Sequence, residues 1–244
     1  MNYAIKLSLF AFVSDTIARS VTVQNNCSFT IWPAMYTETG AAPSYATGWE
    51  APPDTQVTFD APTGWRGRIW GRRDCDFSTS TGACIDGGCD GGLECSGPGS
   101  APATLAEFAL DSDEQDYVDV SVVDGFNLPL EITDSANCGT PSCPVDLNTN
   151  CPEPLQGPFD SSGAPIGCMS ACEAKISGDP SNSPDCCTGN YSTPATCPPS
   201  GVQYFSYFKG NCPNALAYVY DEGSTALWVC ASKPEYTVTF CPAS

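Results

Sequence analysis

The stretch TLAEFALDSDEQDYVDVSVVDGFN, residues 104–127, contains two runs in which apolar and polar residues alternate. The runs cover 104–110 and 117–123, and an acidic segment separates them. Alternation with a period of two is typical of half-buried β-strands, because successive side chains point to opposite faces. This stretch therefore predicts two strands that each turn one face toward a core.

The same alternation recurs along the chain and is interrupted by clusters of Gly, Pro, Asp and Asn, which favour turns. A chain of 244 residues suits one β-rich domain with appended lobes. We therefore predict an all-β protein whose short strands form a sandwich. The further predicted strands cover 21–26, 29–32, 56–59, 67–71, 128–133 and 236–240.

The cysteine count points to an oxidising compartment. The chain has 16 cysteines and no histidine. So many cysteines persist as disulfides outside the cytosol, whereas the alternative, a zinc protein, needs Cys-x-x-Cys pairs or Cys/His clusters that this sequence lacks. We expect a secreted protein with no metal and no cofactor.

The amino-terminal residues fit this expectation. Lys6, the apolar run 7–13 and the small residues Ala18 and Ser20 are typical of a signal peptide covering 1–20, with the mature chain starting within a few residues of Val21. No other stretch is apolar for the roughly 18 residues that a membrane span needs. We expect a monomer that is extracellular or bound to a cell wall.

The net charge of the chain limits the classes of molecule that it can bind. The formal net charge is −19, which repels nucleic acid and disfavours anionic membranes. An uncharged polysaccharide meets no such repulsion.

Cysteines also divide the chain into regions. We expect a small lobe at 75–97 and a larger disulfide-rich lobe at 135–212, with the sandwich formed by 21–74, 98–134 and 213–244. A short helix is expected over 166–176, where Cys168 and Cys172 would share one face. Asn190, in the sequence Asn-Tyr-Ser, is a predicted glycosylation site. Spacing alone does not determine the disulfide pairing.

Several ordered motifs now carry a family resemblance: NNC (25–27), GRIWGR (67–72), TLAEF (104–108), DVSVVDGFN (119–127), CC (186–187) and FCP (240–242). With the 16 cysteines, the set resembles the thaumatin-like, or pathogenesis-related group 5, family from about residue 21 to 242. One departure is Asp86-Gly87-Gly88-Cys89, where the family commonly has Thr-Gly-Asp-Cys.

The resemblance implies a flattened antiparallel β-sandwich of about eleven strands with two disulfide-rich lobes. It also implies a disulfide pairing: Cys27–Cys241, Cys75–Cys84, Cys89–Cys95, Cys138–Cys230, Cys143–Cys212, Cys151–Cys168, Cys172–Cys186 and Cys187–Cys197.

Without histidine or a free thiol, catalysis in this chain must rely on carboxylates. Glycoside hydrolysis needs one carboxylic acid and one carboxylate and little else. The resemblance implies a central cleft lined by Arg68, Glu107, Asp119, Asp124 and Asp221. We expect Glu107 to donate a proton and Asp124 to act as base or nucleophile.

Other interpretations of these residues stay open. Glu107 could be a solvated strand residue, Arg68 a structural ion-pair partner, and Asp221 a cap on its own turn. Asp119 and Asp124 would point to opposite faces of a regular strand, so a bulge or strand end near Asp124-Gly125 is required for a shared cleft.

The resemblance and the charge together predict a secreted endo-β-1,3-glucanase, a glucan-degrading member of the fungal type, with β-1,3-glucan as its partner. We expect Phe126 to offer a face for a sugar ring. The alternative is a non-catalytic β-glucan-binding or antifungal defence protein. Permeabilisation of membranes is disfavoured by the acidic balance.

Overall fold

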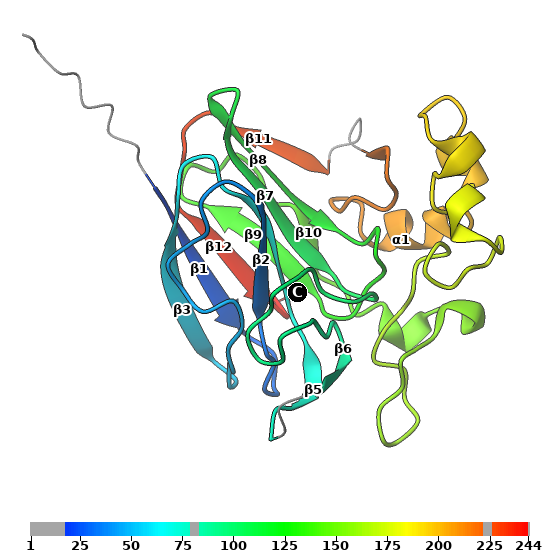
Figure 1. Cartoon of the computed structure of the whole chain (residues 1–244), viewed down its shortest axis with the longest axis horizontal. Coiled ribbons are helices and arrows are strands. Elements are labelled where there is room, and N and C mark those ends of the chain that lie inside the picture. The colour runs from blue at the N-terminus through cyan, green and yellow to red at the C-terminus, as the bar shows by residue number, and fades with distance from the viewer. Residues whose placement is uncertain (1–17, 79–82, 222–225, 244) are drawn as a thin grey trace, which may run out of the picture.

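The computed structural model describes residues 18–78, 83–221 and 226–243 and consists mainly of two five-stranded sheets (Figure 1). The first sheet has the order β10-β9-β12-β1-β3, and the second has the order β11-β8-β7-β4-β2. Neighbouring strands are antiparallel except β1 and β12, which are parallel. The all-β sandwich predicted from the sequence is confirmed.

The strands of the first sheet are β1 (Arg19–Asn25), β3 (Thr55–Ala61), β9 (Leu130–Asp134), β10 (Ser142–Cys143) and β12 (Tyr236–Phe240). Those of the second are β2 (Ala34–Thr39), β4 (Arg66–Trp70), β7 (Leu105–Ser112), β8 (Gln115–Ser121) and β11 (Leu227–Cys230). A separate hairpin joins β5 (Arg73–Asp76) to β6 (Ala83–Asp86).

The core lies between the two sheets. Along β1, buried residues alternate with half-buried ones, so Val21 and Val23 face inward. From the second sheet, Phe108 meets Tyr236 of the first, with ring centroids 5.7 Å apart. Burial of these apolar faces is what holds the layers together, at roughly 25 cal/mol per Å² of apolar surface removed from water. The other face of the second sheet points away from this core, so its side chains can contact solvent or a ligand.

The larger lobe contains little regular structure. The helix expected over 166–176 is wrong: Cys168 forms isolated bridges with Phe126 and Gln156, and successive turns follow it. Two disulfides hold this segment to different partners, which opposes a continuous helix. The described helices are α1 (Phe205–Asn211) and five 3-10 turns: η1 (Asn148–Asn150), η2 (Glu153–Leu155), η3 (Pro180–Asn182), η4 (Gly189–Tyr191) and η5 (Pro199–Gly201).

The structure forms eight disulfides, in the same pairs that the resemblance implied. One of them joins Cys27 to Cys241 across a sequence separation of 214 residues. Closing so long a loop removes unfolded-state entropy worth about 5 kcal/mol in the chain-entropy model. In the part of the chain that the structure describes, no cysteine is free.

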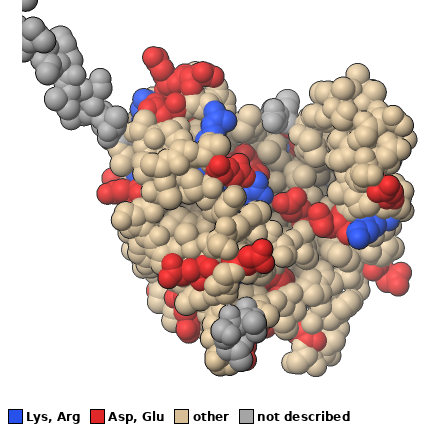
Figure 2. All heavy atoms as spheres, in the orientation of Figure 1, with Lys and Arg blue, Asp and Glu red and all other residues tan. Residues whose placement is uncertain are grey.

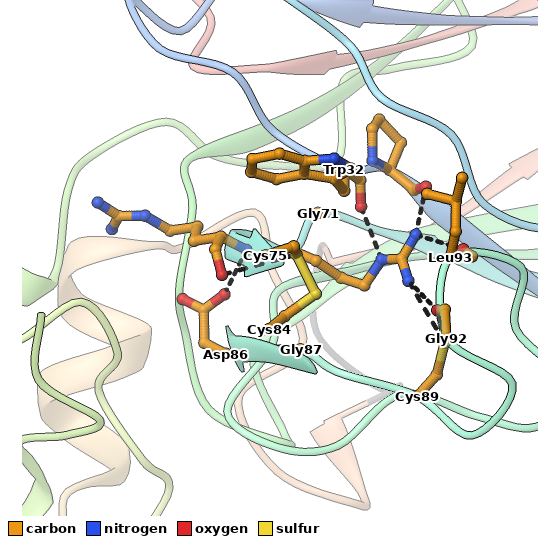
Figure 3. The surroundings of a disulfide bond; sticks show 12 residues. Trp32, Gly71, Cys75, Cys84, Asp86, Gly87, Cys89, Gly92 and Leu93 are labelled. Atoms are coloured by element: carbon orange, nitrogen blue, oxygen red, sulfur yellow. Dashed lines mark hydrogen bonds between the residues drawn. A yellow bond between two sulfur atoms is a disulfide. The ribbon is translucent and has the colours of Figure 1, made fainter. Parts of the chain in front are cut away.

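The small lobe is built around Arg72, which is fully buried. Figure 3 shows the surroundings, with Trp32, Gly92 and Leu93 labelled. The Arg72 guanidinium donates hydrogen bonds to the backbone carbonyls of Trp32, Gly92 and Leu93, at 2.7 to 2.9 Å. Burial lowers the pKa of Arg72 to about 10, so the group stays charged at neutral pH. Arg72 thereby ties the lobe to the sandwich.

The first strand begins with a buried ion pair. Arg19 donates from Nε to Asp116 Oδ2 at 2.8 Å and from Nη2 to Oδ1 at 3.1 Å. Tyr236 also donates its hydroxyl to Asp116 Oδ2, at 3.0 Å. Breaking a buried, hydrogen-bonded pair typically costs 3 to 5 kcal/mol, because it leaves an uncompensated charge. Arg19 is therefore part of the stable fold.

This ion pair yields a prediction about processing. If a signal peptide is removed, the burial of Arg19 favours a cut between Ala18 and Arg19 over the expected cut after Ser20, with Thr16 and Ala18 as the small residues that the peptidase reads. Intact-mass measurement of the secreted protein should give a chain that starts at Arg19. A secreted chain that starts at Val21, with the same melting temperature as a chain that starts at Arg19, would contradict this expectation.

In the described residues, no helix combines the length and apolar character that a membrane crossing requires.

Candidate active site

Three neighbouring strands place charged side chains in one row on the outer face of the second sheet. The register pairs Arg68 of β4 with Glu107 of β7, and Glu107 with Asp119 of β8. Directly opposite residues in antiparallel strands have Cβ atoms about 4.5 to 5.5 Å apart, so these side chains are neighbours. Their strand neighbours Ile69, Ala106, Phe108, Val118 and Val120 point the other way, into the core.

Asp124 joins the row because β8 ends before it. The last residue of β8 is Ser121, and the Gly125 N–H then donates to the Val122 carbonyl to close a turn. Gly125 has a φ of +90°, and a Cβ there would lie 2.7 Å from the carbonyl oxygen of Cys168, so the turn needs glycine. The strand end required for a shared cleft is therefore present.

Arg68 is the centre of the charge network. Its Nη2 lies 3.4 Å from Glu107 Oε1, and its Nη1 lies 3.6 Å from Asp124 Oδ2. Its Nε also donates to Glu38 Oε1 at 2.9 Å. One guanidinium thus holds three carboxylates around itself. Its position makes Arg68 both a structural ion-pair partner and a residue of the site.

The row forms one wall of a cleft of about 620 Å³, lined also by Glu38, Tyr117, Leu216, Tyr218 and Val219. The volume lies within the range of pockets that bind small ligands or short pieces of polymers. Figure 2 shows acidic side chains around a hollow between the sandwich and the larger lobe, with basic side chains beside them. The cleft is therefore open to solvent and acidic.

The environment shifts the titration of these groups. Burial raises the pKa of Glu107, Arg68 opposes the rise, and the charges of Asp124 and Glu38 add to it. Burial also raises the pKa of Asp124, with Arg68 again opposing. Burial acts to lower the pKa of Arg68, but the three carboxylates outweigh it and the pKa is raised. The side chains of Glu107 and Asp124 are still 29% and 42% exposed, so a ligand can reach both.

Two predicted site residues do not reach the cleft. Phe126 is fully buried in the core, so it offers no face to a sugar ring and the prediction for it is wrong. Asp221 is 7% exposed, and its Oδ2 accepts from Lys209 Nζ at 2.8 Å and from the Ala217 N–H at 2.9 Å. It supports the turn that carries Tyr218 and Val219 and does not line the cleft.

Sequence reasoning missed Glu38, Tyr218 and Val219. Glu38 lies in β2, whose sequence AMYTET lacks clean alternation, and the other two lie in a loop. For Glu38, the available signal was its position two residues after Tyr36, which places both on one face of a strand, and this signal is weak. Its contact with Arg68 appears only when β2 pairs with β4.

The carboxyls around Arg68 indicate what chemistry the site can perform. Carboxyls of unlike environment with a cation between them can provide an acid and a base, or can bind hydroxyl groups of a sugar. Elsewhere, Asp134, Cys138 and Cys230 have ligand atoms within 4.8 Å of one another, but the two cysteines form a disulfide and offer no thiolate. Within the described ranges, this group is therefore a poor metal site.

Comparison with known proteins gives consistent matches. The sequence profile described as "Thaumatin family" matches residues 25–242. The chain is 41% identical over 229 residues to pathogenesis-related thaumatin-like protein 3.5 of Cryptomeria japonica, covering 91% of this chain and 90% of that protein. It is 37% identical over 246 residues to a glucan endo-1,3-beta-glucosidase of Prunus avium, covering 98% and 96%.

Among solved structures, the thaumatin-like xylanase inhibitor TLXI matches with a TM-score of 0.48 and 19% identity, covering 91% of this chain and 99% of that one.

Proposed function

Because the chain belongs to the thaumatin family, we propose that it is a secreted endo-acting β-1,3-glucan hydrolase, active outside the cell or in a cell wall. Glu107 donates a proton to the leaving oxygen, and Asp124 acts as base or nucleophile. Asp119 and Arg68 bind the sugar and hold the charges in place. The observation that carries the proposal is the row of Arg68, Glu107 and Asp119, with Asp124 beside it, in one open cleft.

The assignment of acid and base follows from the surroundings of each carboxyl. Burial raises the pKa of both carboxyls and Arg68 opposes both rises, but the charges of Asp124 and Glu38 raise the pKa of Glu107 further. We therefore assign the role of proton donor to Glu107. The similarity to the Prunus avium glucosidase supports the substrate class.

A binding protein without turnover is the second candidate. The position of Arg68 within 3.6 Å of both Glu107 and Asp124 favours it, because a cation between two carboxylates also stabilises both as anions. Reducing-sugar release from laminarin by the purified, disulfide-intact protein tests the two against each other. New reducing ends support the hydrolase. Co-sedimentation with insoluble glucan without new reducing ends supports the binding protein.

The raised pKa values give a prediction for pH. Glu107 must be protonated and Asp124 ionised, so activity falls at high pH as Glu107 loses its proton and at low pH as Asp124 gains one. We expect a bell-shaped profile of laminarin hydrolysis with its maximum at roughly pH 4 to 6. A rate that rises continuously from pH 5 to pH 8 would contradict this assignment.

A further inference from the structure

A second hollow of about 320 Å³ lies beside the cleft, on the side of the larger lobe. Its walls come from residues 170–173, from the start of α1 and from residues 217–219. Val123, Asp124, Tyr218 and Val219 line both hollows. The two spaces therefore meet at Asp124, and we call the second one the side pocket.

The side pocket combines apolar walls with a polar rim. Phe205, Phe208 and Ala217 supply apolar surface. Phe205 packs edge-on against Tyr218, with ring centroids 5.3 Å apart, so the aromatic wall is fixed in place. A sugar ring has apolar C–H faces and a rim of hydroxyls, and a pocket with this combination suits it.

Two acidic side chains that line the side pocket differ in what they already bind. Asp185 accepts from the Gln203 N–H at 2.8 Å and from Ser177 Oγ at 2.5 Å, so it organises the lobe. Glu173 is exposed at the rim. Glu173 and Asp124 both line the side pocket, so the two carboxyls face a common space. Glu173 is the group that remains to contact a ligand.

We propose that the side pocket is a glycosyl subsite that extends the cleft, with Glu173 accepting hydrogen bonds from sugar hydroxyls. The inference rests on the proposed function. Continuity through Asp124 favours a glucan that already occupies the cleft over a separate small molecule. Phosphorylated or sulfated ligands would meet two carboxylates and be repelled. The volume is at the lower end of ligand pockets, so the subsite takes a short piece of the chain.

The test compares Glu173→Trp, which fills the pocket mouth, with Glu173→Gln, which removes the charge and keeps the size. Glu153→Trp is the matched control, because Glu153 is an exposed glutamate of the same lobe that lines neither hollow. Affinities for linear β-1,3-glucan oligosaccharides of increasing length are measured by calorimetry. Thermal melts without ligand show whether each variant is folded.

In the wild type, affinity should rise when the oligosaccharide becomes long enough to enter the side pocket. Glu173→Trp should remove that gain, by about tenfold for the long ligands, and Glu173→Gln should reduce it by a smaller factor. Glu153→Trp should match the wild type. If folded Glu173→Trp and Glu173→Gln both keep the full gain, the subsite is refuted while glucan binding in the cleft stands. If the wild type binds no glucan, the proposed function fails, and the subsite with it.

Discussion

Replacing Glu107 with Gln should lower the rate of laminarin hydrolysis by at least about 100-fold, because general acid catalysis typically contributes 10² to 10⁴. The amide keeps the size of the side chain but has no proton to donate to the leaving oxygen. Glucan affinity should stay within about threefold, since Arg68, Asp119 and Asp124 remain in the cleft. Reducing-end release and co-sedimentation, measured on the same preparations, give the two quantities.

A matched control variant shows whether activity is lost because the proton donor is missing or only because one negative charge is removed. Glu235→Gln makes the same replacement at an exposed glutamate just before β12, far along the chain from the row, and should keep wild-type turnover. Asp124→Asn should lose activity as Glu107→Gln does, because the reaction needs both carboxyls. Full turnover by a folded Glu107→Gln protein would refute the assignment of Glu107 as the proton donor.

Alternation in the sequence predicted most strands of the sandwich, because burial of one face leaves a period of two. It did not predict β2, which lacks a clean alternation, or β10 and β11, which have only two and four residues. The segment 29–32 alternates, yet it forms only an isolated bridge between Ile31 and Ala51. Alternation reports which side chains face inward but not which backbone groups find a partner strand.

The residue pattern alone could not predict that these charged residues form a row. Which residues lie opposite one another depends on the pairing register, and here the register shifts between Ala109 and Ser112 in the β7–β8 pair. A shift of one residue would move a side chain to the other face. The family resemblance named Arg68, Glu107, Asp119 and Asp124, and the structure brings these four together.

The predictions that Phe126 and Asp221 line the cleft failed for different reasons. Phe126 follows a turn, and its N–H donates to the Cys168 carbonyl, which draws the ring into the core. Asp221 has the local role that its turn-like sequence allowed, as a cap on the turn formed by 217–221. The residue type alone could not show that Phe126 and Asp221 are buried, because aromatic residues and aspartates occur both in the interior and on the surface of proteins.

The small lobe contains a buried carboxyl whose charge has a direct effect on stability. Asp86 of β6 is 3% exposed, and its Oδ1 accepts from the Arg73 N–H at 2.9 Å (Figure 3). Its Oδ2 is buried without a hydrogen-bond partner among the described residues. The nearby Asn127 amide donates to the Gly71 carbonyl at 2.9 Å, and it also acts to lower the pKa of Asp86. Burial raises the pKa of Asp86 to about 7, with Arg73 opposing the rise.

A raised pKa means that the folded protein holds this proton more tightly than the unfolded chain does. The stabilisation is complete below the ordinary value of 3.8 and is lost as the pH rises through about 7, by about 4 kcal/mol in all. For a chain of this size, we expect the melting temperature of the wild type to fall by roughly 10 °C more between pH 4 and pH 8 than that of Asp86→Asn.

The pKa values of Glu107 and Asp124 are also raised, but both residues are present in both proteins, so their effect cancels in the comparison. Asp60→Asn, at an exposed position in β3, should follow the wild type. Equal pH slopes for the wild type and Asp86→Asn would show that Asp86 is ionised in the folded lobe, and that Arg73 and Asn127 stabilise its charge despite the burial.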